Sequence, residues 1–162
     1  MKSRSLQSFE DRIEISDVMK RYAFGVDKRL PEVIADCFQK NVFSSYNGIE
    51  LGEGRDKIVR LMSAASSYVS TMHHVGTIFF HDLSAEFANV EHYSIAYLLS
   101  RTENGSHVLV TRGVNYQDKL VKVSAGWKIQ HRIHSVAWSV EMPAVPSPAL
   151  PEAFLRSAGI ID

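Results

Sequence analysis

Between residues 77 and 138 the chain alternates apolar and polar side chains with a period of two, interrupted only by short polar stretches. This period is typical of β-strands, in which successive side chains point to opposite faces. It predicts strands at TIFF, EFANVEHYSIAYLLS, HVLVTRGVNYQDKL and GWKIQHRIHSVAW. The segments between them, HDLSA, RTENGS and VKVSAG, have the residues of hairpin turns. Such a run of long antiparallel strands needs another layer to cover one of its faces.

The first part of the chain has the spacing of helices. Apolar residues recur at helical intervals from about residue 8 to residue 26, which predicts a first helix with one apolar stripe. The stripe consists of Ile15, Val18, Tyr22 and Val26. A short helix at PEVIADCF, a strand at NVFSSYNG, a loop at IELGEGRD and a third helix at DKIVRLMSAA are expected to follow. Helices that precede a run of strands indicate an α+β fold, with three helices on one face of a curved sheet.

The chain is expected to form one domain, from residue 1 to residue 140. Residues 141–162 form a tail in which MPAVPSPALPEAF carries four prolines. Proline lacks a backbone donor, so an extended irregular segment is expected, with a short helix at PEAFLRSAG. We expect the tail to pack on the domain or on a neighbouring subunit.

Composition excludes several classes of function. Lys plus Arg and Asp plus Glu number 18 each, so nothing indicates a partner with the charge of nucleic acid or of an anionic membrane. No apolar run approaches the length of a membrane span. The start, MKSRSLQSFEDR, lacks the apolar stretch of a secretory signal, so a cytoplasmic protein is expected. The single cysteine, Cys37, leaves no intrachain disulfide and no multi-cysteine metal site.

The segment STMHHVGT, residues 70–77, places two histidines next to each other. In an extended strand, His73 and His74 cannot both face the interior. One of them is expected to point inward and the other outward.

Several segments resemble the SnoaL-like branch of the nuclear transport factor 2 superfamily. They are RYAFGVDKR, TMHHVG, GIELGEGRDKI and GVNYQDKLVKVSAGWKIQHR, and the resemblance covers roughly residues 8 to 140. Within that branch the chain is similar to hexachlorocyclohexane dehydrochlorinase, bile acid 7α-dehydratase and, more distantly, scytalone dehydratase. The resemblance implies a cone-shaped α+β barrel, with a curved mixed or antiparallel sheet covered by the three N-terminal helices.

The resemblance also implies a catalytic pair, which falls on Asp27 and His73. His73 would then face the interior of the cone together with Thr71 and Val75, and His74 would face the layer between sheet and helices or a subunit contact. A histidine held by an aspartate is a general base, which needs no nucleotide cofactor and no metal. The structural alternative is that Asp27 ends the first helix and His73 is a satisfied core histidine.

Two tyrosines match positions of the same enzymes, and both are candidate substrate-binding residues. Tyr46 matches a tyrosine of scytalone dehydratase, and Tyr22 matches one of bile acid 7α-dehydratase. Five residues of a regular helix rotate by about 140°, so Tyr22 and Asp27 would both face the pocket only if the helix ends or distorts near Gly25. Ordinary tyrosine packing is the alternative for each.

Other positions depart from the enzyme patterns. Ala96 and roughly Val136 stand where bile acid 7α-dehydratase has an aspartate and an arginine. His92 is several residues out of register with the second histidine of scytalone dehydratase. These departures count against any specific dehydratase activity.

The remaining basic residues leave several roles open. His131 and His134 lie on opposite faces of the last strand, so no metal site is expected from them. Arg112 and Arg132 lie on pocket-bearing strands and could hold an anionic group of a substrate, although a solvated or interface arginine is the more frequent case.

Taken together, these features predict a cofactor-independent lyase or isomerase acting on a small, apolar, cyclic molecule. The alternatives are a protein that only binds hydrophobic ligands, and an accessory subunit resembling the small subunit of ring-hydroxylating dioxygenases. A homo-oligomer is expected, with a trimer first and a dimer second. Tyr93, Tyr97 and Trp138 would form its contact surface on the open face of the sheet.

Overall fold

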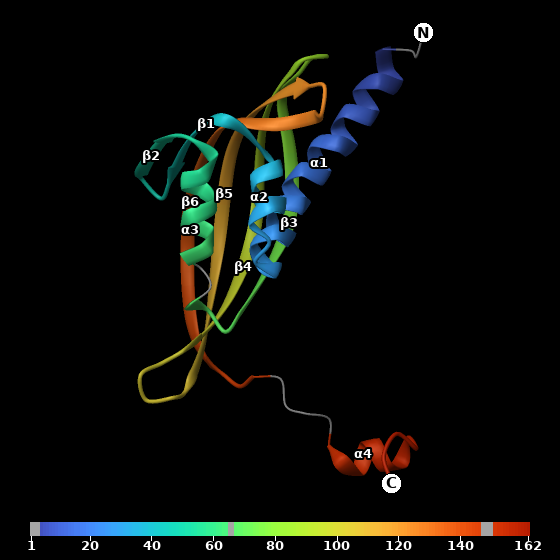
Figure 1. The fold of residues 1–162 in the computed structure, drawn as a ribbon, viewed down its shortest axis with the longest axis vertical. Coiled ribbons are helices and arrows are strands. Elements are labelled where there is room, and N and C mark those ends of the chain that lie inside the picture. Colours follow the sequence, from blue (N-terminus) through green and yellow to red (C-terminus); the bar gives the residue numbers. More distant parts are fainter. Residues whose placement is uncertain (1–3, 65–66, 147–150) are drawn as a thin grey trace.

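The structure is a computed structural model that describes residues 4–64, 67–146 and 151–162. Three helices and two short strands occupy the first part, and four long strands follow (Figure 1). In chain order the elements are α1 (Arg4–Lys28), α2 (Pro31–Asp36), β1 (Phe38–Tyr46), β2 (Ile49–Glu53), α3 (Arg55–Ala64), β3 (Ser70–Leu83), β4 (Phe87–Arg101), β5 (His107–Val123), β6 (Gly126–Ala144) and α4 (Glu152–Ser157).

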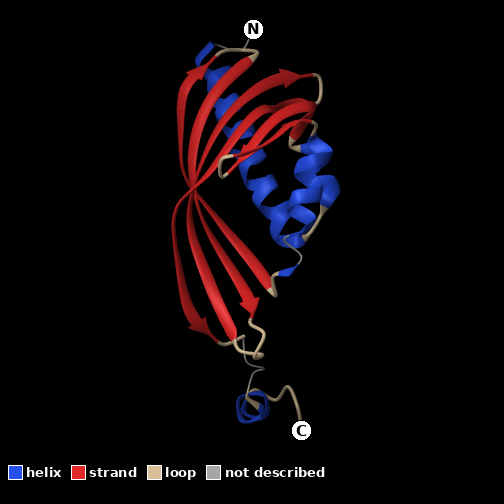
Figure 2. Ribbon diagram, turned by 90° about the vertical axis from the view of Figure 1, so that its left-hand side faces the viewer, coloured by secondary structure: helices blue, strands red, loops and turns tan. Residues whose placement is uncertain are grey.

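The strands of the described residues form one mixed sheet in the order β2-β1-β6-β5-β4-β3. Only β1 and β6 run parallel, and every other neighbouring pair is antiparallel. The sheet is strongly curved, and α1, α2 and α3 lie on its concave side (Figure 2). The expected α+β fold, a cone-shaped curved sheet covered by three N-terminal helices, is therefore confirmed.

The core lies between the helices and the concave face of the sheet. All four residues of the predicted stripe on α1 are buried, as are the facing residues of the strands. The largest fully buried apolar side chains are Trp127, Phe38, Ile15, Met19, Ile58, Leu120 and Ile129. Burial of each such side chain contributes roughly 1.5–3 kcal/mol to stability, so this layer holds the helices against the sheet.

The prediction of a loop at IELGEGRD is wrong, because residues 49–53 form the strand β2. The turn before it is made by Asn47 and Gly48, both with positive φ (51° and 82°), which joins β1 and β2 as a hairpin. Gly52 also has positive φ (69°), and the register shifts between Ser44 and Ser45. These irregularities hide the alternation from which a strand is recognised in a sequence.

The long strands extend further than the alternation predicted. β3 begins at Ser70 and therefore includes both adjacent histidines, and β5 continues to Val123. β6 runs on to Ala144, into the first residues of the tail. The longer strands extend one end of the sheet beyond the helices (Figure 2).

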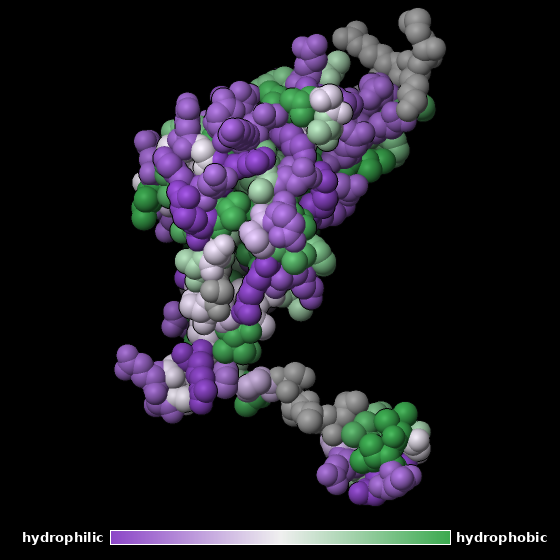
Figure 3. Space-filling model, viewed as in Figure 1, coloured by the Kyte–Doolittle hydropathy of each residue, from purple (hydrophilic) through white to green (hydrophobic). Residues whose placement is uncertain are grey.

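The C-terminal helix α4 forms where a short helix was expected, and it has no buried residue. Figure 3 shows apolar side chains gathered on one side of this segment, where Phe154, Ile160 and Ile161 are exposed. Residues 147–150 of the tail lie outside the described residues. Packing of the tail on a neighbouring subunit therefore stays a prediction. No described helix has the length and apolar character that crossing a membrane requires.

Candidate active site

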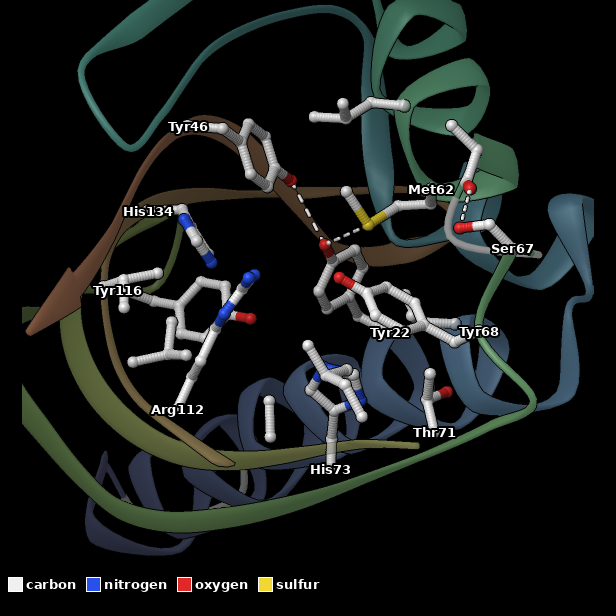
Figure 4. A pocket seen from close by; sticks show the side chains of 17 residues that line it. Tyr22, Tyr46, Met62, Ser67, Tyr68, Thr71, His73, Arg112, Tyr116 and His134 are labelled. Carbon is white, nitrogen blue, oxygen red and sulfur yellow. Dashed lines mark hydrogen bonds between the residues drawn. The ribbon is translucent and has the colours of Figure 1, made fainter. Parts of the chain in front are cut away.

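A cavity of about 350 Å³ opens between the concave face of the sheet and the helices. Its volume lies in the range of pockets that hold small molecules. Most of the surface of its wall is apolar, and several polar side chains reach into it (Figure 4). The polar side chains that line it are Tyr22, Tyr46, Ser67, Tyr68, Thr71, His73, Arg112, Tyr116 and His134.

His73 lies at the wall of this cavity, and the carboxylate of Asp27 lies behind it. Oδ1 of Asp27 is 2.6 Å from Nδ1 of the His73 ring and accepts a hydrogen bond from the Thr71 hydroxyl at 2.8 Å. Oδ2 accepts the backbone N–H of His73 at 2.7 Å. One carboxylate, which makes three hydrogen bonds to Thr71 and His73, therefore joins the end of α1 to the start of β3.

The charge of Asp27 is stabilised by these contacts. Burial would raise the pKa of Asp27, but the hydrogen bonds from the ring and backbone of His73, attraction to His73 and the Thr71 hydroxyl hold it below its usual value. An ionised carboxylate can only accept, so Nδ1 of His73 is the ring nitrogen that carries the proton. Nε2 then has a free lone pair, which is the state a general base needs.

The neighbouring His74 points to the opposite side of the sheet and is exposed. Because the helices lie on the side of His73, the alternative that placed His74 between sheet and helices is wrong. Its other expected place, a subunit contact, stays a prediction.

Tyr22 and Asp27 both serve the site although α1 stays helical through Gly25 to Lys28. No distortion near Gly25 is needed, because Asp27 does not itself line the cavity. Tyr22 lines the cavity directly, whereas Asp27 reaches the site from the side, through His73. The two residues can thus differ by more than a third of a turn and still act on one pocket.

Tyr22 and Tyr46 meet at their hydroxyl groups, which are 3.2 Å apart, and Tyr22 also donates to Sδ of Met62 at 3.2 Å (Figure 4). Burial raises the pKa of Tyr22 and raises that of Tyr46 well above the usual value. Both phenols are therefore neutral at physiological pH and keep their hydroxyl protons.

Arg132 does not line the pocket and is fully buried, so neither a contact with an anionic group of a substrate nor a solvated position applies to it. Its guanidinium is fully buried and binds both oxygens of Asp118, at 2.8 and 2.6 Å. The rings of Tyr22 and Tyr116 lie against it, with centroids at 4.2 and 4.7 Å. This pair is a structural ion pair beneath the pocket. Arg112, by contrast, lines the cavity, as expected.

The other histidines fall into different surroundings. His92 is buried beneath the pocket, stacked on Tyr116 and 3.4 Å from the Asp118 carboxylate. His131 stacks on Phe43, away from the cavity wall. His134 lines the pocket. It lies on the opposite face of β6 from His131, as the alternation predicts. The described residues contain no group of three or more His, Cys, Asp or Glu side chains arranged to hold a metal ion.

Sequence reasoning missed five polar or polarisable residues of the wall: His134, Tyr116, Ser67, Tyr68 and Met62. His134 could have been found, because it shares a strand face with Val136, which was placed near the site. Met62 lies on α3, and Tyr68 lies in the segment after it. No sequence periodicity indicates how that segment folds over the sheet.

The model of the SnoaL-like domain family matches residues 7–133. The chain belongs to this family. A comparison with curated protein sequences finds no match.

Solved structures with the same fold include a candidate scytalone dehydratase from Novosphingobium aromaticivorans. That structure is 22% identical, covers 88% of this chain and 94% of its own, and has a TM-score of 0.74. A type 2 hexachlorocyclohexane dehydrochlorinase is 18% identical over 91% of this chain and 97% of its own, with a TM-score of 0.73. A candidate dehydratase of the nuclear transport factor 2-like family from Streptomyces avermitilis is 11% identical over 80% and 98%, with a TM-score of 0.70. At these identities the likeness shows a common fold.

Proposed function

We propose that this SnoaL-like protein is a cofactor-independent lyase or isomerase that acts on a small, largely apolar, cyclic compound. The observation that carries the proposal is the contact of 2.6 Å between Asp27 and Nδ1 of His73 at the wall of an apolar cavity. The aspartate fixes the tautomer and stabilises the imidazolium that forms when His73 takes a proton. A protein that only binds apolar ligands has no use for such a base.

The reaction begins when Nε2 of His73 removes a proton from a carbon of the substrate that lies beside a carbonyl or a leaving group. In elimination, the electron pair of the broken C–H bond forms a C=C bond, and the leaving group departs with the electron pair of its own bond. In isomerisation, the imidazolium returns the proton to another carbon. Either reaction needs no electron donor or acceptor besides the substrate.

The hydroxyl pair of Tyr22 and Tyr46 is suited to binding the leaving group or the carbonyl oxygen of the substrate. A departing hydroxide needs a proton, and a neutral phenol can supply it and later recover it from the imidazolium through water. The two hydroxyls lie 3.2 Å apart, so both can reach one oxygen of a bound molecule. The chemistry of dehydrating and dehydrochlorinating enzymes among the structural neighbours is compatible with these roles.

Proton abstraction can be tested before the product is known. Cyclic ketones, hydroxylated aromatics and halogenated rings are incubated with the protein in D₂O, and exchange of C–H for C–D is followed by NMR together with product formation. For a compound that exchanges or reacts, His73→Ala should lower the rate by about two to four orders of magnitude while the protein stays folded and binds the compound. His74→Ala is the matched control and should stay close to the parent rate.

Asp27→Asn should also be severely impaired, because an amide can favour the wrong tautomer of His73 and cannot stabilise its charged form. The proposal is refuted if the panel is bound without exchange or turnover, which is the behaviour of a binding protein. It is also refuted if His74→Ala is inactive and His73→Ala active.

A further inference from the structure

Arg112 brings a permanent positive charge into the pocket. Among the described residues its side chain has no ion-pair or hydrogen-bond partner, although Arg132 on the next strand is paired with Asp118 through Nε and one of its two terminal nitrogens. The residues that line the cavity include no Asp and no Glu. Figure 4 shows the Arg112 side chain reaching from its strand into the open centre of the pocket. A guanidinium in apolar surroundings is stabilised by an anion, and the wall does not supply one.

The base and the cation lie in one row across the sheet. His73 on β3 pairs with Ala96 on β4, and Ala96 pairs with Arg112 on β5. Paired residues on neighbouring strands point to the same face, and strands lie about 4.8 Å apart. The Cα atoms of His73 and Arg112 are thus roughly 10 Å apart, with both side chains on the concave side.

The floor between the base and the cation is low and apolar. Ala96, which stands between them, carries only a methyl group, and Leu98, Val114 and Val136 continue the apolar surface along the cavity wall. A flat ring can lie on Ala96 with one edge at His73 and the other at Arg112. A side chain larger than alanine at this position would fill that space.

We infer that the substrate is a small apolar ring that carries a carboxylate, bound with the carboxylate on Arg112 and with the carbon that loses its proton across the ring, beside His73. The inference deepens the proposed function and rests on it for the part that concerns His73. A carboxylate is the anion favoured here, because its two oxygens match the planar fork of a guanidinium. Arg112 is then a specificity-determining residue.

The test compares ligands of equal shape and different charge. Benzoate and benzamide are titrated against the full-length protein by calorimetry near neutral pH. A charge-assisted bidentate pair is worth roughly tenfold to a hundredfold in affinity, so benzoate should bind at least about tenfold more tightly. Added salt should weaken the binding of benzoate and leave that of benzamide nearly unchanged.

Arg112→Met should bring the two affinities to within about twofold, since it keeps much of the apolar stem and removes the charge. Arg101→Met, which removes an exposed arginine at the end of β4, is the matched control and should keep the preference. Arg112→Lys should retain part of the preference for benzoate. This variant is used for the test if Arg112→Met does not fold.

The inference is overturned if the parent protein binds benzamide as tightly as benzoate, if neither ligand binds at millimolar concentration, or if Arg112→Met keeps the preference. His73→Ala separates the two proposals, because it should keep the preference for benzoate while losing proton abstraction. A preference for the anion without turnover of any ring carboxylate would support the binding role of Arg112 and refute the proposed function.

Discussion

His134 is a half-buried pocket residue whose buried Nδ1 has no hydrogen-bond partner among the described residues. Its ring stacks on Tyr46 at a centroid distance of 5.0 Å and meets the edge of Tyr116 at 5.1 Å. Burial, followed by the positive charge of Arg132, lowers the pKa of His134 to about 4. The imidazole is therefore neutral in the folded protein at physiological pH.

This neutral histidine should make the protein less stable in mild acid. The unfolded chain binds a proton at His134 below about pH 6.5, whereas the folded protein binds it only near pH 4. Between these values the unfolded state holds more protons, so stability falls as the pH falls, by up to about 1.4 kcal/mol per pH unit from this group. Urea unfolding near pH 7 and near pH 5 measures the loss.

His134→Phe keeps the ring and removes the titration, so this variant should lose less free energy of unfolding than the parent protein between the two pH values. His92, whose pKa is also lowered by burial, stays in both proteins and does not affect the difference. An equal loss in parent and variant would show that His134 does not contribute to the acid sensitivity.

At the scale of elements, the buried pair of Arg132 and Asp118 joins β6 to β5 beneath the pocket. The same guanidinium lies 4.2 Å from the ring centroid of Tyr22 on α1 and 5.1 Å from that of Phe38 on β1. The helix that carries Tyr22 and Asp27 is therefore packed against a charged group that the sheet supplies. The ion pair positions the pocket and does not enter it.

Removal of one partner of this pair should destabilise the fold strongly. Arg132→Met leaves Asp118 buried without its counter-charge, and we expect a loss of about 3–5 kcal/mol in the free energy of unfolding. The double variant with Asp118→Leu should recover much of that loss, because both charges are then gone. Urea unfolding of the three proteins checks this, and a loss below about 1 kcal/mol for Arg132→Met would match an exposed pair instead.

At the scale of the whole molecule, the outer face of the sheet carries several large apolar side chains. Tyr93, Tyr97 and Trp138 are exposed by 52%, 38% and 48%, and other exposed apolar residues lie on β3 and β6. These are Met72, Phe79, Val140 and Met142. A contiguous exposed apolar surface on long strands is typical of an interface between proteins.

We expect this face to join copies of the chain, in a trimer first and a dimer second. Sedimentation velocity at micromolar concentration should show one oligomer for the parent protein. Trp138→Glu should shift it towards the monomer, because a carboxylate in an apolar interface is costly to bury. Ile49→Glu, at the tip of the β1–β2 hairpin, is the control and should not. A parent protein that sediments as a monomer would contradict this expectation.

Residue periodicity alone predicted the central parts of the long strands, the stripe on α1 and the opposite faces of His73 and His74, because each depends only on neighbours along the chain. The pairing of Asp27 with His73 was inferred from resemblance, since 46 residues separate them. The strand β2 was hidden by glycines with positive φ, and its formation depends on pairing with β1.

Only the tertiary structure distinguished the two arginines of the neighbouring strands. Arg112 and Arg132 have the same charge and similar settings in the sequence, yet Arg132 meets Asp118 in the core and Arg112 faces the cavity. The difference is decided by strand register and by which helix covers which part of the sheet. These long-range contacts are not encoded in any local pattern, and they place the base, the hydroxyl pair and the unpaired cation around one cavity.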